Sequence, residues 1–266
     1  MKTVSSRQSP VVQTFRALAR TPDPAGERLL LDGVHLVRDA RAAGAAIEIA
    51  AVAASRAQDT SEEADVARRL AADGIRVVSA TGQAFAAMSP VRAPSGIVAI
   101  ARRRPADAGE ICARRDSFVL VAIGVQDPGN LGSLVRAGEA GGATGVLVCG
   151  ASANPFSWKA VRGSMGSILR LPVAAGLTAE AAVGTLRARG VRTIAAAPRH
   201  GRDPDAVDWR GRVALLVGGE GPGLSADIVD AADDRVTIPM AAPVESLNVA
   251  VAAAILVYAA RRQRHE

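Results

Sequence analysis

The feature that most constrains the fold of this chain is a series of short, nearly continuous apolar runs in its second half. The first run, at 118–125, contains no polar side chain, which is typical of a strand buried on both faces. Similar strand-like runs lie at 146–149, 192–196, 213–217 and 235–238, with helix-like stretches at 131–140, 157–168, 179–189, 225–230 and 247–262. Strands that alternate with helices at this spacing predict a mostly parallel sheet with helices on both faces.

The first half of the chain shows the same alternation on a smaller scale. Strand patterns lie at 28–31, 47–53, 75–79 and 96–101, and helix patterns at 34–43, 62–73 and 83–88. The alternation breaks after Arg102-Arg103-Arg104-Pro105, where proline, glycine and charged residues indicate a linker. We therefore expect an α/β protein with a domain at 1–104, a linker at 105–116 and a second domain at 117–266.

The positive charge of the chain suggests a polyanionic partner. Of 266 residues, 32 are Lys or Arg and the formal net charge is +6, and only Lys2 and Lys159 are lysines. Arginine matches phosphate oxygens well, although a GC-rich genome would favour arginine codons without any function. The first 22 residues carry Lys2, Arg7, Arg16 and Arg20 without an acidic residue. This segment is expected to be either a nucleic-acid-binding arm or a disordered leader.

Several classes of protein do not fit the sequence. The longest apolar stretch, 249–260, is shorter than the ~20 residues of a membrane-spanning helix, and the first 20 residues contain no signal-like apolar block. A cytoplasmic protein without a membrane segment is expected. Cys112 and Cys149 are too few for a disulfide framework or a zinc site, and the three histidines are scattered, so we expect no metal and two buried thiols.

The first segment with candidate chemistry follows the first apolar strand directly. Residues 126–136 are Gln-Asp-Pro-Gly-Asn-Leu-Gly-Ser-Leu-Val-Arg. The Asp-Pro-Gly sequence favours a turn, and Asn130 is a good helix N-cap. Arg136 would lie about one and two-thirds turns into the new helix. Open α/β sheets bind ligands at the carboxyl ends of their strands, so this is a candidate site, but a capped structural helix fits equally well.

The second segment, 216–225, also follows an apolar strand and places four glycines within six residues. Glycine permits unusual dihedral angles and a close approach of the backbone to a ligand. The spacing is neither the dinucleotide fingerprint nor a P-loop. A plain tight loop would need fewer glycines and would not place Glu220 at its centre, so a ligand-binding loop is favoured.

The third segment, 236–249, ends a strand at Pro239 and leads into the last helix. Glu245, Ser246 and Asn248 cluster where the apolar helix begins. A helix N-cap would explain Ser246 alone. It would not explain Asn248 in an apolar stretch, where a buried amide without partners is costly.

Together, the three segments resemble the three motifs of the SpoU family, a branch of the SPOUT methyltransferases. The matching residues are Asn130, Gly132 and Arg136, then Gly219, Glu220, Gly221, Gly223 and Leu224, then Ile238, Pro239, Met240, Glu245, Ser246, Leu247 and Asn248. Residues 162–166 are similar to the family's stretch between motifs one and two. The first half resembles the family's amino-terminal RNA-recognition domain, a ribosomal-protein-like α/β unit, at 31–37 and 94–99. The resemblance covers most of 7–262.

The resemblance implies a carboxyl-terminal α/β domain with a trefoil knot, a homodimer with its catalytic site near the interface, and S-adenosylmethionine as cofactor. It implies methyl transfer to a ribose 2′-hydroxyl of RNA, and the separate recognition domain favours 23S ribosomal RNA. The alternatives are the same chemistry on transfer RNA and a non-catalytic RNA-binding protein on the knotted scaffold. The intact set of motif residues argues against the second.

The resemblance also assigns roles to residues. Arg136 would bind the phosphate beside the target ribose and polarise the hydroxyl, oriented by Asn130, Glu220, Ser246 and Asn248. The cofactor would be held by Gly218, Gly219, Glu220, Gly221, Ile238, Met240 and Leu247. Two departures stand out. The first is that Ala242 and Pro243 stand where family members often have glycines, and Ala242 would be strained if its φ were positive. The second is Gly138 in the middle of the motif-one helix, where glycine should cost roughly 1 kcal/mol relative to alanine.

Overall fold

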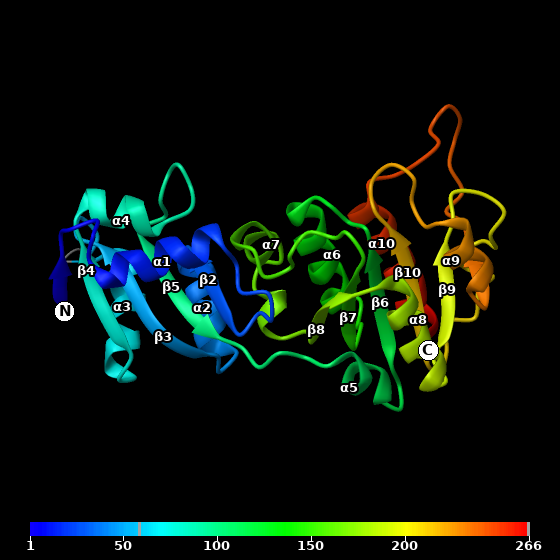
Figure 1. Cartoon of the computed structure of the whole chain (residues 1–266), viewed down its shortest axis with the longest axis horizontal. Coiled ribbons are helices and arrows are strands. Elements are labelled where there is room, and N and C mark those ends of the chain that lie inside the picture. The colour runs from blue at the N-terminus through cyan, green and yellow to red at the C-terminus, as the bar shows by residue number, and fades with distance from the viewer. Residues whose placement is uncertain (58–59, 265–266) are drawn as a thin grey trace. The chain divides into compact units, whose positions relative to one another are not determined.

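The computed structural model describes residues 1–57 and 60–264, so His265 lies outside the described residues. The chain forms two compact units (Figure 1). Unit 1 consists of Met1–Arg104 together with Phe156–Arg170, and unit 2 consists of Pro105–Pro155 together with Leu171–Glu266. Each unit is built on its own sheet, which agrees with the α/β fold expected from the sequence.

Unit 1 contains a mixed five-stranded sheet in the order β1-β4-β3-β5-β2. Its strands are β1 (Lys2–Val4), β2 (Arg28–Asp32), β3 (Ala46–Ala53), β4 (Arg76–Ala80) and β5 (Ile97–Arg102). Strand β4 pairs in parallel with β1 and β3, while β5 is antiparallel to β3 and β2. Its helices are α1 (Pro10–Arg20), α2 (Val34–Ala42), α3 (Glu62–Ala72), α4 (Gly82–Met88), α7 (Trp158–Gly163) and the 3-10 helix η1 (Ser167–Leu169).

The amino-terminal segment is folded, so the expectation of a disordered leader is wrong, while nucleic-acid binding by this segment stays a prediction. Strand β1 pairs with β4, and helix α1 begins at Pro10, where proline suits the first helical turn. Val12 and Phe15 lie one turn apart on α1 and are fully buried in a core shared with α4. This apolar spacing fixes the helix against the sheet.

The sheet of unit 2 has six strands in the order β11-β9-β10-β6-β7-β8, and every pair is parallel. Its strands are β6 (Phe118–Ile123), β7 (Gly145–Cys149), β8 (Val173–Leu177), β9 (Arg192–Ala196), β10 (Val213–Gly218) and β11 (Asp234–Val236). The predicted parallel sheet is confirmed. The edge strand β8 was not predicted, because Gly176 interrupts its short apolar pattern of Val-Ala-Ala.

Helices cover both faces of this sheet. They are α5 (Ala108–Ala113), α6 (Pro128–Ala140), α8 (Ala179–Ala188), α9 (Ala226–Ala231) and α10 (Val249–Arg264). Helices α5, α8 and α9 share one core with Val119 and Val121 of β6. Alternate residues of a strand face opposite sides, and Leu120 lies beside Gly138 of α6 on the other side, where α6 packs against α10.

Two predicted boundaries differ from the structure. The stretch expected to be a linker contains α5, which buries Ile111 and Cys112. The helix expected at 157–168 ends early at Gly163, and η1 follows after Gly166, whose φ of 85° breaks the helical path. Both cysteines are buried as predicted, and burial raises the pKa of Cys149 to about 12.

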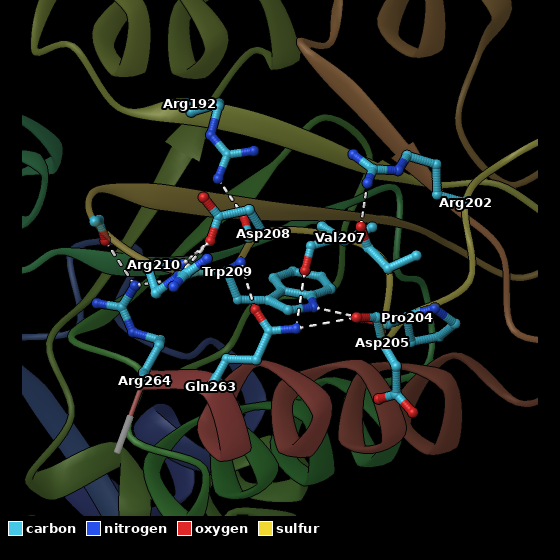
Figure 2. A network of polar contacts seen from close by, with 12 residues as sticks. Arg192, Arg202, Pro204, Asp205, Val207, Asp208, Trp209, Arg210, Gln263 and Arg264 are labelled. Atoms are coloured by element: carbon cyan, nitrogen blue, oxygen red, sulfur yellow. Dashed lines mark hydrogen bonds and ion pairs between the residues drawn. The ribbon is translucent and has the colours of Figure 1, made fainter. Parts of the chain in front are cut away.

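The last turn of α10 fastens the loop between β9 and β10 (Figure 2). Trp209 of this loop is fully buried and packs edge-on against Phe118. The Gln263 side chain accepts a hydrogen bond from the Trp209 backbone N–H at 3.1 Å and donates to the Val207 carbonyl at 3.0 Å. Arg264 donates to the carbonyl oxygens of Trp209 and Gly211 at 2.7 and 2.6 Å. The last described turn of α10 is therefore tied to the buried Trp209 of unit 2.

Within the described ranges, no helix is long and apolar enough to cross a membrane. In the same part of the chain, no three His, Cys, Asp or Glu side chains gather as metal ligands.

Candidate active site

The candidate site lies at the carboxyl edge of the sheet in unit 2. Strands β6 and β10 are neighbours there, and Gly218 at the end of β10 is in register with Ile123 at the end of β6. The loop after each strand therefore begins at the same edge, together with the loop that follows β11. This is the edge at which open parallel sheets bind their ligands.

The first helical turn of α6 presents Asn130 toward this edge. Asp127, not Asn130 as predicted, is the N-cap, because its carboxylate accepts the Asn130 backbone N–H at 2.8 Å. Pro128 occupies the first turn of the helix, where its missing N–H costs nothing. The Asn130 side chain is thus free to bond to other loops.

Three side chains from three distant segments form a continuous hydrogen-bonded network. Asn130 Nδ2 donates to Glu220 Oε1 at 2.7 Å, and Asn248 Nδ2 donates to Asn130 Oδ1 at 3.0 Å. The Gln126 backbone N–H donates to Glu220 Oε2 at 3.1 Å. Each amide group is used in one defined direction, so the network fixes the orientation of Asn130.

Asn248 is also the residue that begins α10. Its Oδ1 accepts the backbone N–H groups of Ala250 at 2.9 Å and Val251 at 3.3 Å. The expected burial of Asn248 is wrong, because the residue is exposed at the helix start. Its amide is nevertheless fully engaged, with the oxygen on the helix and the nitrogen on Asn130.

The carboxylate of Glu220 is kept ionised by its donors. Partial burial alone would raise its pKa, but hydrogen bonds from Asn130 and from backbone N–H groups of the surrounding loops outweigh this effect. The net result is a pKa below the ordinary value for glutamate. Glu220 therefore acts as a hydrogen-bond acceptor that holds Asn130.

The glycines of the 218–223 loop have separate structural reasons. A side chain on Gly219 would overlap the backbone of Gly124, and one on Gly218 would overlap the backbone of Gly223. Gly221 and Gly223 have φ values of 93° and 69°, a region that favours glycine. The loop thus folds tightly on itself and against the end of β6, which leaves its outer backbone open.

This loop forms one wall of a cavity of about 420 Å³. The lining also includes 196–198 after β9 and 246–249 at the start of α10. The cavity is lined by every residue that the sequence assigned to the cofactor, namely Gly218, Gly219, Glu220, Gly221, Ile238, Met240 and Leu247, and by Ser246 and Asn248. Its volume falls in the range of roughly 300–1,000 Å³ that is usual for small-molecule sites.

Arg136 is placed apart from this network. It is exposed on α6, and in the described part of the chain it forms no hydrogen bond or ion pair. Six residues of helix rotate its side chain about 240° from that of Asn130. The structure therefore brings Asn130, Glu220 and Asn248 together and leaves Arg136 available for a ligand.

Sequence reasoning missed the wall that follows β9. Ala196, Ala197 and Pro198 line the cavity, and the next residue, Arg199, forms an ion pair with Glu245 at 2.9 Å. The signal was available, because 192–196 was predicted as a strand of the same parallel sheet. Its carboxyl end had to lie at the same edge as the other loops.

The two departures noted in the sequence have simple outcomes. Met165 and His200 are the non-glycine residues with positive φ among those described, so Ala242 is not strained in this way. Gly138 is buried on α6, and an added Cβ would lie 3.4 Å from Leu120 Cδ2, at the limit of ordinary contact. An alanine would therefore fit, and packing does not explain glycine at this position.

The SpoU rRNA Methylase family matches residues 117–258. A Synechocystis protein described as an uncharacterized tRNA/rRNA methyltransferase is 31% identical, over 98% of this chain and 94% of its own. The Bacillus subtilis 23S rRNA (guanosine(2553)-2′-O)-methyltransferase RlmP is 30% identical, over 97% and 98%. The crystal structure of an S-adenosylmethionine-bound rRNA methyltransferase from Sinorhizobium meliloti is similar with a TM-score of 0.84 and 29% identity, over 98% of this chain and 97% of that one.

Proposed function

Because this chain belongs to the SpoU rRNA Methylase family, we propose that it methylates the 2′-hydroxyl of one ribose in 23S ribosomal RNA. The chain is an S-adenosylmethionine-dependent RNA methyltransferase. What we propose is that its substrate is 23S ribosomal RNA and that it acts in the cytoplasm. The observation that supports methyl transfer at this site is the network of Glu220, Asn130 and Asn248 at the wall of a glycine-lined cavity.

The residues of the cavity fit S-adenosylmethionine. Its apolar lining, which includes Leu224, Val229 and Leu256, suits the adenine ring, and the open backbone of the 218–223 loop offers polar groups to the ribose and the methionine moiety. We assign Gly218, Gly219, Gly221, Ile238, Met240 and Leu247 to this binding, with Glu220 at the edge. When bound, the cofactor supplies an activated methyl group on a positively charged sulfur.

The chain's own residues must then align and activate the ribose hydroxyl. In the transfer, an O–C bond forms, the C–S bond breaks with its electron pair left on sulfur, and the hydroxyl loses its proton. Arg136 binds the adjacent phosphate and polarises the hydroxyl, and the proton leaves through that phosphate or a water, because a guanidinium is already protonated and has no site to accept it. Asn130 and Asn248, held by Glu220 and the start of α10, orient the ribose, and Ser246 adds a further hydroxyl.

The RNA is recognised by unit 1 in this proposal. A separate α/β unit suits a large folded RNA, and the similarity to RlmP extends over 97% of the chain, so it includes this unit. Transfer RNA remains the competing substrate, since the Synechocystis relative is named for either class. Mapping of 2′-O-methyl groups in 23S and transfer RNA, from cells with and without the gene, separates the two.

A homodimer is part of the proposal. Leu247, Val251, Ile255 and Tyr258 are exposed large apolar side chains at spacings of three or four residues, three of them on α10. Such a stripe on a soluble helix marks an interaction surface, and the same helix begins at the site with Asn248. A second copy packed on α10 would bring the two sites close to the interface.

Arg136→Ala is the decisive variant for the proposed chemistry. We expect methyl transfer to 23S RNA to fall about 100- to 1,000-fold, because the guanidinium would no longer stabilise the negative charge that develops on the hydroxyl oxygen beside the phosphate. Calorimetric binding of S-adenosylhomocysteine should remain unchanged, since Arg136 neither lines the cavity nor adjoins a stretch that does. Arg115→Ala, which removes an exposed arginine elsewhere in unit 2, is the matched control. Near-normal turnover of Arg136→Ala would overturn the proposed role.

A further inference from the structure

One ion pair that the proposed chemistry does not use lies next in sequence to two stretches that line the cavity, although neither of its residues is part of the lining. Arg199 follows the wall formed by 196–198, and Glu245 precedes the wall formed by 246–249. The Arg199 Nη2 and Glu245 Oε1 atoms are 2.9 Å apart, and the two side chains are 69% and 78% exposed. The pair therefore joins the two walls in contact with solvent.

Arg199 stands on a rigidly held turn. The Gly201 backbone N–H donates to Thr237 Oγ1 at 2.8 Å, and this hydroxyl donates to the Ala197 carbonyl at 3.0 Å. Thr237 and Arg202 are also joined through their backbones at 2.9 Å, and a Cβ on Gly201 would lie 2.6 Å from the carbonyl carbon of Val236. The turn that carries Arg199 is thus locked to the end of β11, and only its side chain is free to adjust.

The rest of the cavity lacks a cation for an anionic ligand group. Of the described residues that line it, Glu220 is the charged one, and the others are glycines, apolar residues, Ser246 and Asn248. The amino-acid end of S-adenosylmethionine carries both a carboxylate and an ammonium group. Charged groups are costly to bury without partners, so this end belongs at the open rim and the adenine belongs in the apolar interior.

We propose that the Arg199–Glu245 pair is the subsite for the amino-acid end of the cofactor. Arg199 binds the carboxylate, Glu245 binds the ammonium group, and the pair opens to admit them. The geometry carries the proposal: two opposite charges lie in contact, each directly beside a residue that lines the cavity, one on a fixed turn and one on the loop that leads into Ser246. The inference rests on the proposed position of S-adenosylmethionine in this cavity.

The test compares two ligands that differ only at the proposed contact. S-adenosylhomocysteine has the amino-acid end, and 5′-methylthioadenosine lacks it but keeps the adenosine and the sulfur. Titration calorimetry of the full-length protein should show that Arg199→Ala weakens S-adenosylhomocysteine about fivefold, the ratio that corresponds to ~1 kcal/mol for an exposed ion pair. The affinity for 5′-methylthioadenosine should stay the same.

Three further proteins make the result specific. Arg210→Ala breaks an ion pair of similar exposure with Asp208, away from the cavity, and should leave both affinities unchanged. Glu245→Gln should weaken S-adenosylhomocysteine alone, as Arg199→Ala does. The exchange variant Arg199→Glu/Glu245→Arg should recover part of the lost affinity, because it restores both charges at the rim.

The outcomes separate this inference from the proposed function. Equal weakening of both ligands by Arg199→Ala, or no weakening of either, would overturn the subsite. Failure of the unaltered protein to bind either ligand would instead overturn the placement of the cofactor in the cavity.

Discussion

Replacing Gln263 by Ala tests whether the last turn of α10 holds the β9–β10 loop in place. Gln263 accepts the Trp209 backbone N–H and donates to the carbonyl oxygens of Val207 and Asp205, at 3.1, 3.0 and 3.3 Å (Figure 2). The truncation leaves a partly buried N–H and a partly buried carbonyl without partners. Trp209 itself, fully buried beside Phe118, would then lose part of its support.

The expected size follows from counting these bonds. Two bonds of good length are lost, each contributing about 1 kcal/mol, and the longer contact to Asp205 adds little. We expect unit 2 to lose about 2 kcal/mol of its free energy of unfolding. With a urea m-value of about 2 kcal/mol/M, the midpoint should fall by about 1 M.

The assay must report on unit 2 alone, because two units need not unfold together. Trp158 belongs to unit 1 and Trp209 to unit 2, so a Trp158→Phe background leaves the fluorescence of Trp209 as the probe. Arg261→Ala is the control, since Arg261 is exposed two residues earlier on α10 and has no partner in the described part of the chain. The reasoning fails if Gln263→Ala shifts the urea midpoint no further than Arg261→Ala does.

Two further predictions concern the site and the assembly. The lowered pKa of Glu220 means that its carboxylate stabilises the folded state above its unfolded pKa of about 4.5, and that this contribution disappears as pH falls through the folded value. Urea unfolding between pH 7 and pH 3.5 should therefore show a smaller acid loss for Glu220→Gln than for the unaltered chain, and parallel curves would contradict the assignment. Val251→Glu/Ile255→Glu should shift the mass in light scattering from twice the 27.2 kDa chain mass to that of one chain, and an unchanged mass would remove the dimer surface.

The parallel core of unit 2 could be predicted from the sequence because its strands are apolar on both faces. The run that begins at Phe118 has no polar alternation, so a central strand was the consistent interpretation. Short edge elements lack this signal: β1 has three residues and β8 contains Gly176. Helix α5 was missed because its six residues bury little beyond Ile111 and Cys112.

That the three candidate segments meet could be predicted, but not the bonds between them. Strand direction placed Asn130, Glu220 and Asn248 at one edge, although they are 90 and 118 residues apart. Which residue capped each helix depended on loop geometry that no spacing encodes, and Asp127 and Asn248 took the roles expected of Asn130 and Ser246. The assigned roles of these residues in catalysis stay predictions until the variants are measured.

The network depends on residues that carry no chemistry. Asn130 lies in the first turn of α6 and Asn248 directly precedes α10, so their side chains meet only if the two helices pack closely along their length. Gly141 at the end of α6 permits this, because a Cβ there would overlap Val257 of α10. Gly219 does the same for Glu220, since a side chain would push its loop away from the end of β6. Glycine at both places is therefore required for the hydrogen bonds of the network. For this reason the apolar and glycine pattern of the sequence indicates where the network forms.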